Sequence, residues 1–123
     1  KVQFLGNRND LKDVLAAIDI FVLPSYYGEG MPKVLLEAAS CGCAVITSDH
    51  PGCRDAIVPG ETGMLVPIKD SIALEKALIH LLSDQGLIKS MGKAGRQLAV
   101  KKFCITKVVD IHYSLYRALL KCY

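Results

Sequence analysis

The sequence predicts an α/β fold, in which a Rossmann-like parallel sheet carries helices on both faces. Two short runs, residues 20–23 and 44–47, are apolar throughout, and longer stretches with helical periodicity lie between the strand candidates. Strands that are apolar on both faces are typical of parallel sheets covered by helices. A parallel strand pair also needs a long crossover, which a helix can supply. The alternation of the two patterns therefore favours a Rossmann-like layer.

The first half of the chain begins with a strand candidate at residues 2–5, Val-Gln-Phe-Leu. Asp10 then offers an N-cap to a helix that reaches about residue 18, because apolar residues recur there at helical spacing. The next strand, at residues 20–23, is closed by Pro24.

The later elements follow from the same signals. A helix is predicted at residues 32–41, because Pro32 suits a first helical turn and Gly42 suits its end. Residues 44–47 and 64–66 are strand candidates, and the Pro-Gly pairs near 51 and 59 indicate turns. Asp70 is the expected cap of the first of three more helices, at residues 70–82, 85–102 and 105–122.

Length and composition indicate one domain. The chain has 123 residues, of which 51% are hydrophobic and 22% charged, and about 100–200 residues is usual for a domain. The longest uncharged run, residues 38–48, has eleven residues, whereas a membrane-spanning helix needs about 20. The chain starts without methionine, inside a strand-like run. We therefore expect residues 1–123 to form a single partial domain of a larger protein.

Charge is distributed unevenly along the chain. Residues 1–84 hold seven Lys/Arg and eleven Asp/Glu, whereas residues 85–123 hold eight Lys/Arg and one acid. The two basic C-terminal helices could face phosphate, nucleic acid or an anionic membrane, or simply present a solvated face. Because no aromatic residues interleave with the charges, we expect no nucleic-acid partner. Peripheral contact with a membrane stays open.

Cysteine usage bears on compartment and on metal binding. Five cysteines without regular spacing favour a reducing compartment, so we expect a cytoplasmic protein, with peripheral attachment at the inner face of the membrane as an option. Cys41, Cys43, His50 and Cys53 could supply four zinc ligands, but Cys-x-Cys is narrower than the usual spacing of structural zinc sites. We predict no metal and thiols packed as small hydrophobes.

Chemistry is expected where the strands end, because such sheets bind ligands outside their carboxyl ends. Three loops should meet there, at residues 6–9, 25–30 and 47–50. The middle loop runs as Gly28-Glu29-Gly30 into the helix that Pro32 begins. Glycines let a ligand approach the backbone, and the first N–H groups of a helix lack internal partners. The loop is either an ordinary turn or an anion site suited to a diphosphate.

Glu37 stands alone among apolar residues on the same helix. We expect it to be buried, with Lys33 as its partner four residues earlier, because an unpaired buried carboxylate is costly. Its two oxygens match two adjacent hydroxyls of a sugar ring. Phosphates at the helix start and sugar hydroxyls beside them describe a nucleotide sugar.

These residues resemble a known family. Glu29 and Glu37 form a Glu-x7-Glu pair within residues 23–38, which is similar to the signature of retaining glycosyltransferases of family four, with the two-domain GT-B fold. Residues 41–48 and 61–67 resemble the family as well, and the similarity covers essentially the whole chain. The resemblance implies a partial C-terminal domain of a GT-B fold, the half that binds the nucleotide-sugar donor.

The resemblance also implies roles for particular residues. Glu29 would contact hydroxyls of the transferred sugar, Glu37 would hold the ribose, and both are the candidate catalytic residues. The donor would be a UDP- or GDP-sugar, its sugar would pass to an acceptor hydroxyl with retention, and no metal or cofactor would be needed. Residues flanking the base and lying along sugar and diphosphate are the remaining candidates for donor binding: Gly6, Asn7, Arg8, Gly28, Gly30, Met31, Pro32, Lys33 and Val34.

Two further expectations concern the chain as a piece. The N-terminal acceptor domain of the family would be its partner, and without that domain the chain should be inactive. The alternative is a non-catalytic Rossmann-like module that binds nucleotide or phosphate without transfer.

Four aromatic side chains are ambiguous. His50 is either a solvated loop residue or a donor contact, and His112 lies on an apolar stripe, where a packed histidine is expected. Tyr26 and Tyr27 could equally stack on a sugar or pack against the protein.

Overall fold

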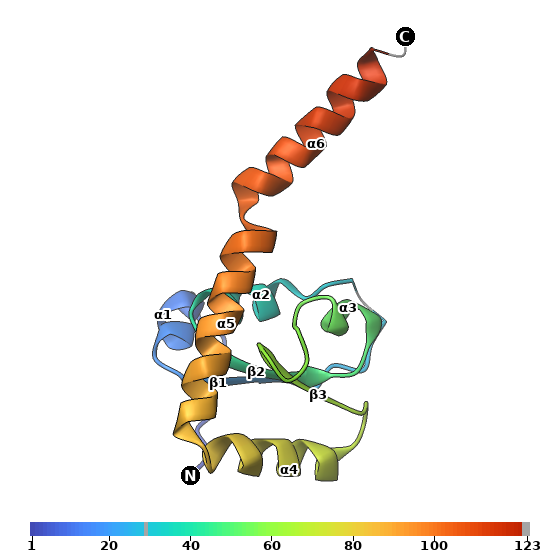
Figure 1. The fold of residues 1–123 in the computed structure, drawn as a ribbon. Helices are drawn as coiled ribbons and strands as arrows, with labels where there is room; N and C mark the ends of the chain where they lie inside the picture. The colour runs from blue at the N-terminus through green and yellow to red at the C-terminus, as the bar shows by residue number, and fades with distance from the viewer. Residues whose placement is uncertain (29, 122–123) are drawn as a thin grey trace.

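The computed structural model of the chain describes residues 1–28 and 30–121, and it shows three strands and six helices in this part of the chain (Figure 1). Helices and strands alternate up to α4, after which two long helices follow. Their bounds are α1 (Leu11–Ala16), β1 (Ile20–Leu23), α2 (Lys33–Ser40), β2 (Ala44–Ser48), α3 (Pro51–Arg54), β3 (Gly63–Val66), α4 (Ser71–Leu82), α5 (Gln85–Phe103) and α6 (Ile105–Leu120).

The sheet is parallel throughout, in the order β1-β2-β3. Ile20 pairs with Ala44 at the start of β1, and Val45 pairs with Gly63 at the start of β3. β2 lies in the centre and all five of its residues are buried, whereas β1 and β3 form the two edges. The predicted α/β class with a Rossmann-like parallel sheet is thus confirmed.

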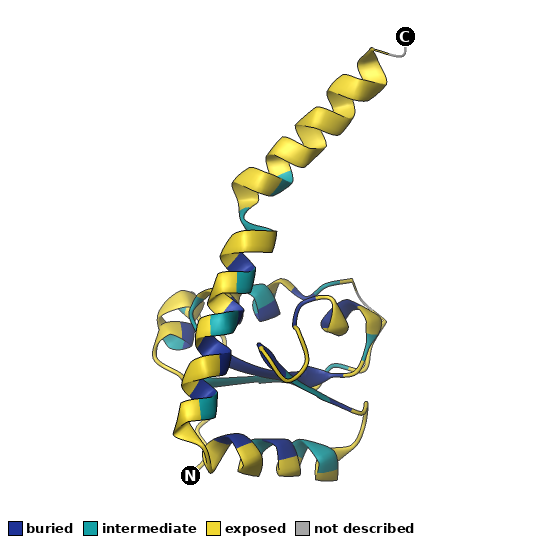
Figure 2. Cartoon of the chain, in the orientation of Figure 1, coloured by how far each residue is buried: buried dark blue, intermediate teal, exposed yellow. Residues whose placement is uncertain are grey.

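Helices cover both faces of the sheet, because neighbouring residues of β2 point to opposite sides. Cys43 and Val45 belong to one core cluster, with Leu15 of α1 and Leu35 of α2. Ala44 and Ile46 belong to a second cluster on the other face, formed mainly with α4 and the first half of α5. Figure 2 shows the buried residues gathered along the sheet and along the sides of the helices that face it.

Asp70 and Asp10 both occupy the N-cap positions predicted for them, but only Asp70 caps its helix with its side chain. The Asp70 side chain accepts a hydrogen bond from the backbone N–H of Ala73 at 2.8 Å, which satisfies one of the free donors at a helix start. Asp10 occupies the N-cap position of α1 but caps nothing, because its carboxylate instead pairs with Arg8. The α1 helix also ends at Ala16, two residues before the predicted end.

Two local predictions are wrong. Residues 2–5 form no strand, and Val2 and Phe4 are 85% and 94% exposed. A strand needs a partner for its backbone groups, and in the described chain no strand pairs with this segment. Residues 51–54, expected to form a turn, form the short helix α3 instead, because Pro51 takes the first helical position, where its missing N–H is harmless.

The two C-terminal helices differ in environment. α5 packs against α2 and β2, whereas α6 extends away from the body of the fold and has no buried residue (Figures 1 and 2). Most of its large apolar side chains, including Val109 and Leu115, are more than half exposed, whereas Val108 is partly buried. His112 is exposed rather than packed, and its Nδ1 lies 2.7 Å from the carbonyl oxygen of Val108. Within the described residues, no helix combines the length and hydropathy needed to cross a bilayer.

Two glycines on the inner side of α5 differ in how closely the rest of the domain approaches them. A Cβ placed on Gly92 would lie 2.0 Å from the carbonyl oxygen of Gly42, which follows α2 in a left-handed conformation at φ +85°. A Cβ on Gly95 would meet only ordinary contacts, the nearest at 3.7 Å. Only the first glycine is therefore required by the packing.

This contrast gives a paired test. We expect Gly92→Ala to lower the free energy of unfolding by about 3 kcal/mol, because a helix must move away from backbone that cannot yield. We expect Gly95→Ala to raise it by up to about 1 kcal/mol, because alanine is the better helix former. Urea unfolding of both variants measures this, and equal effects of the two would contradict the packing described.

Candidate functional site

The segments that follow β1, β2 and β3 all leave the sheet on the same side, on the right in Figure 1. Thr47 joins two of the strand ends, because its Oγ1 donates a hydrogen bond to the carbonyl oxygen of Leu23 at 2.9 Å. The β1–α2 loop then passes directly into the N-terminus of α2. This edge gathers the described parts of two of the three loops predicted to meet there, residues 25–28 with 30, and residues 47–50.

The N-terminus of α2 is open. Pro32 is the N-cap residue, with φ −64° and ψ 121°, and it has no side-chain acceptor to offer. Its carbonyl oxygen accepts from the N–H of Leu35 at 3.1 Å. The N–H groups of Lys33 and Val34 precede the first residue that can have an intrahelical partner. These groups and the positive end of the helix dipole favour an anion at this point.

The approach to this helix is unobstructed at its glycines. No atom lies within 4 Å of the position that a Cβ would take on Gly28 or on Gly30. Met31 is half-buried and packs against the first core cluster, which fixes the loop just before the helix. Glu29, the first candidate catalytic residue, lies outside the described residues.

Glu37 is exposed, so the prediction that it is buried is wrong. The helix buries Leu35, Ala38 and Ala39, and Glu37 lies between them in sequence but on another side of the helix. Lys33 and Glu37 are both described, and they form no ion pair with each other. The apolar composition of the helix therefore led to an overestimate of how far Glu37 is buried. Because the carboxylate is exposed, water hydrates it and it needs no charged partner.

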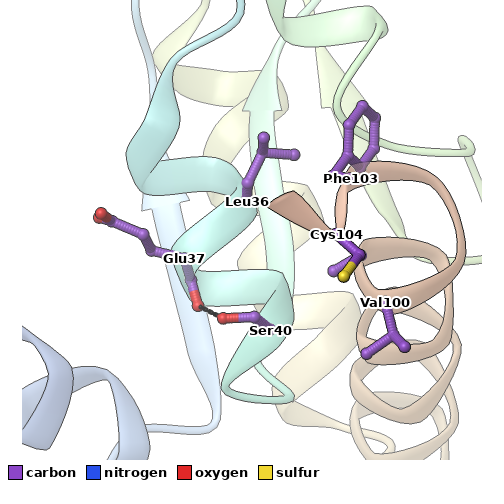
Figure 3. Close-up of a pocket in the computed structure, with 7 residues that line it drawn as sticks. Leu36, Glu37, Ser40, Val100, Phe103 and Cys104 are labelled. Atoms are coloured by element: carbon purple, nitrogen blue, oxygen red, sulfur yellow. Dashed lines mark hydrogen bonds between the residues drawn. The ribbon is translucent and has the colours of Figure 1, made fainter. Parts of the chain in front are cut away.

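The side chain of Glu37 borders two cavities. One, of about 270 Å³, lies between α1 and α2 and includes Lys12 and Leu15. The other, of about 330 Å³, lies between α2 and the junction of α5 with α6 and includes Phe103. Figure 3 shows the carboxylate pointing away from Phe103 and Leu36, while Ser40 Oγ donates to the carbonyl oxygen of Glu37 at 2.8 Å. The carboxylate is thus accessible to a ligand.

The predicted base-flanking residues lie on the exposed segment before α1. Gly6, Asn7 and Arg8 are all exposed, and Gly6 has a left-handed φ of +66°. Arg8 Nε donates to Asp10 Oδ1 at 2.7 Å, and this bond lowers the pKa of Asp10. Among the described residues, no hydrogen bond or ion pair joins the segment to α2. Of the described candidates, Gly28 and those from Gly30 to Glu37 thus share one loop and helix, whereas these three lie on a separate segment.

One ion pair at this edge, Asp49 with Arg54, was missed by sequence reasoning, and His50 differs from both expectations in part. Asp49 accepts a hydrogen bond from Arg54 Nε, which lowers the pKa of Asp49 and ties the end of β2 to α3. The only sequence signal is the spacing of five residues, which is too common to be specific. His50 is half-buried rather than freely solvated, and its Nδ1 is buried without a hydrogen-bond partner among the described residues.

The two tyrosines of the middle loop contact each other and a lysine. The rings of Tyr26 and Tyr27 are stacked with centroids 4.3 Å apart, and their hydroxyl oxygens lie 3.0 Å apart. Lys69, from the segment between β3 and α4, places its Nζ 4.9 Å from the centre of the Tyr26 ring. Lys69 also has a left-handed φ of 59°, unusual outside glycine.

The cysteines do not form a metal site in the described part of the chain, where no three His, Cys, Asp or Glu side chains are grouped suitably. Cys43 and Cys53 are buried in the first core cluster. The Cys43 thiol donates to the carbonyl oxygen of Leu15 at 3.2 Å. Burial is the main cause that raises the pKa of Cys43 to about 11, with the nearby Cys41 and Asp19 adding to it.

Taken together, an α/β layer with an open helix N-terminus at the strand ends, and an exposed carboxylate about one turn further along that helix, defines a Rossmann-like ligand-binding domain. A family model described as glycosyl transferases group 1 matches residues 1–98. The chain belongs to this family.

Named relatives agree with the assignment. The chain is 39% identical over 100 residues to an N,N'-diacetylbacillosaminyl-diphospho-undecaprenol α-1,3-N-acetylgalactosaminyltransferase of Campylobacter jejuni, covering 81% of this chain and 26% of the relative. It is 38% identical over 117 residues to a UDP-Gal:α-D-GlcNAc-diphosphoundecaprenol α-1,3-galactosyltransferase of Escherichia coli, covering 94% and 30%. The chain thus spans between a quarter and a third of the length of these relatives.

Solved structures show the same fold. A sucrose-phosphate synthase from Thermosynechococcus elongatus superposes with a TM-score of 0.85 at 34% identity, over 89% of this chain and 27% of the other. The C-terminal domain of a group 1 glycosyl transferase from Francisella tularensis gives 0.74 at 32% identity, over 85% and 53%. A glycosyltransferase from Rickettsia africae gives 0.92 over 98% and 32%, at 24% identity. The fold is accordingly part of the C-terminal domain of a GT-B glycosyltransferase.

The cysteine environments predict an order of reactivity. Backbone and side-chain hydrogen bonds from Thr106, at the start of α6, lower the pKa of the half-buried Cys104 thiol. At about pH 8 we expect iodoacetamide to alkylate Cys104 well before the buried Cys43, because the thiolate is the reactive form. Peptide mass spectrometry over a time course measures the rates.

The raised pKa of Cys43 also makes the stability of the fold depend on pH. The pKa of Cys43 is raised in the folded chain, so its contribution to the free energy of unfolding is complete at neutral pH and is lost as the pH rises toward about 11. Unfolding in urea is the control for the alkylation experiment, because it should abolish the difference in rate between Cys104 and Cys43. Equal alkylation rates of Cys104 and Cys43 in the folded chain would contradict the environments described for the two thiols.

Proposed function

We propose that this chain is the donor-binding half of a retaining glycosyltransferase, which transfers a sugar from a nucleotide sugar to an acceptor hydroxyl. One observation carries the proposal. The uncapped N-terminus of α2, approached through Gly28 and Gly30, lies less than two turns from the exposed carboxylate of Glu37. An anion site beside a free carboxylate suits a ligand that has a diphosphate next to sugar hydroxyls.

Similar proteins support a nucleotide-sugar donor. HepE of Anabaena, whose structures contain UDP or UDP-glucose, superposes on the chain with a TM-score of 0.86 to 0.88 at 23% identity, a likeness of fold. The Escherichia coli relative is named for UDP-Gal. We propose a UDP- or GDP-sugar as the donor, bound outside the strand ends.

The proposed roles follow the chain through the loop and into the helix. The residues from Gly28 to Val34, with Glu29 between them, lie along the sugar and the diphosphate, and Glu37 accepts hydrogen bonds from the ribose hydroxyls. Gly6, Asn7 and Arg8 flank the base. As the bond to the leaving diphosphate breaks, negative charge grows on its oxygens, and the N–H groups of Lys33 and Val34 stabilise that charge in place. Positioning and charge stabilisation are the work of this domain.

The remaining partner in this proposal is an N-terminal acceptor domain. The apolar side chains of α6 are exposed, and patches of this kind mark surfaces that other protein or lipid covers.

The Campylobacter and Escherichia coli relatives have names that include a diphospho-undecaprenol acceptor. We propose a cytoplasmic protein that works at the inner face of a membrane, with the isolated chain inactive in transfer.

Binding of nucleotides by the chain itself tests the anion site. On addition of UDP or GDP, we expect amide chemical shifts of Lys33 and Val34 to move in NMR spectra, because the diphosphate accepts their hydrogen bonds. Glu37→Gln should weaken binding roughly ten- to 150-fold, since a hydrogen bond to a charged group contributes about 1.5–3 kcal/mol. Its melting temperature should stay near that of the parent, because the side chain is exposed and has no ion pair with Lys33.

Glu75→Gln is the matched control, because Glu75 is an exposed carboxylate on α4. It should leave nucleotide affinity unchanged. If Glu37→Gln and Glu75→Gln behave alike, the assignment of Glu37 is wrong. Binding by the chain without any transfer in the full-length protein would favour the alternative, a non-catalytic nucleotide-binding module.

In the intact enzyme the two glutamates should differ in their kinetics. Contacts to the transferred sugar strengthen as charge develops at its anomeric carbon, whereas contacts to the ribose do not change during the reaction. Glu29→Gln should therefore mainly lower kcat, and Glu37→Gln should mainly raise KM for the donor. Steady-state kinetics measure both. Changes within about threefold for both variants, under ~1 kcal/mol, would show that the carboxylates are not part of the site.

A further inference from the structure

A cavity of about 300 Å³ opens at the carboxyl ends of the strands, on the α4 side of the sheet. It lies between Tyr26 of the β1–α2 loop and the β3–α4 segment with the first turn of α4. Neither Glu37 nor any residue of α2 lines it. It is thus separate from the anion site at the start of α2, although both open at the same edge of the sheet.

The lining of this cavity includes one polar side chain from the end of β2 that is almost fully buried. Ser48, the last residue of β2, is 1% exposed. Side chains alternate along a strand, so Ser48 shares the face of Ala44 and Ile46, which pack toward α4 and α5. Thr47, by contrast, faces the other side of the sheet, where its Oγ1 donates a hydrogen bond to the carbonyl oxygen of Leu23. The Ser48 hydroxyl can both donate and accept a hydrogen bond, so it can pair with a ligand group of either kind in the cavity.

The walls combine charges of both signs with apolar surface. Lys69 lies over the Tyr26 ring, and Asp70 uses Oδ1 to cap α4 while its second carboxylate oxygen accepts no hydrogen bond in the described chain. Val66 and Leu74 supply the apolar part of the lining. A simple anion would meet Asp70 here and a simple cation would meet Lys69, so the lining suits neither.

We propose that this cavity binds a pyranose ring of a saccharide, in a subsite separate from the donor site. The hydroxyls of a sugar both donate and accept hydrogen bonds, so they match Asp70, Lys69 and Ser48 together. The C–H groups of a pyranose match the apolar floor. The volume is at the lower end of the range for small-molecule pockets, about 300–1,000 Å³, as expected for one ring. The subsite does not depend on sugar transfer by the protein.

The test is a titration of the 123-residue chain with simple glycosides. Methyl α-glucopyranoside and methyl N-acetyl-α-glucosaminide are the probes, and glycerol controls for weak, unspecific polyol contacts. We expect a saturable change in the amide signals of Ser48, Val66 and Ser71 with at least one glycoside and none with glycerol. UDP should leave these three signals unchanged while it shifts those of Lys33 and Val34.

Two variants connect the binding to the cavity. Ser48→Ala removes the buried hydroxyl and should weaken binding by at least about fivefold. Ser71→Phe, at an exposed position on the rim, should block the cavity without disturbing the core. Ser90→Phe is its control, because it makes the same change at an exposed position of α5, away from the cavity.

Three results would overturn the proposal. The first is that neither glycoside gives a saturable change. The second is that binding persists undiminished in both Ser48→Ala and Ser71→Phe. The third is that UDP rather than a glycoside perturbs Ser48, Val66 and Ser71, which would assign the cavity to the donor site. Loss of UDP binding at α2 with glycoside binding intact would count against the donor proposal alone.

Discussion

The burial of β2 on both faces is the constraint on which the rest of this structure depends. Adjacent residues of β2 point into two different core clusters, one on each face of the sheet. For this reason α1, α2 and α3 must cover one face while α4 and α5 cover the other. Once α2 is held against Val45, its N-terminus can only lie at the carboxyl ends of the strands. The position of the proposed anion site thus follows from hydrophobic burial rather than from any polar contact within the site.

Most of the fold could be predicted from the sequence because its signals were local. Continuous apolar runs marked all three strands of the sheet, and Asp70 marked the start of α4 through its own side chain. The segment at residues 2–5 shows the limit of this reasoning. Its composition is that of a strand, but strand formation needs hydrogen-bonding partners from elsewhere, and an apolar run cannot report whether they are present.

The candidate site was predictable in part. Gly28 and the residues from Gly30 to Val34 lie together because they are close in sequence, and the helix N-terminus beside them was visible in the sequence. The exposure of Glu37 was not, because it depends on which side of α2 faces the sheet. Lys69 contacts Tyr26, although the two residues belong to separate loops. The burial of the Ser48 hydroxyl likewise depends on other parts of the chain. Contacts of this kind have no sequence period and arise only from the fold.

The edge position of β1 has a consequence for how the chain behaves during folding. In the described structure β1 pairs only with β2, so its outer row of N–H and C=O groups is not used by the sheet. Neither a charge nor a proline interrupts residues Ile20–Leu23, and such interruptions are what usually discourage intermolecular strand addition. The chain on its own therefore presents a template for aggregation. Its yield in refolding should depend on protein concentration, even where the folded domain itself is stable.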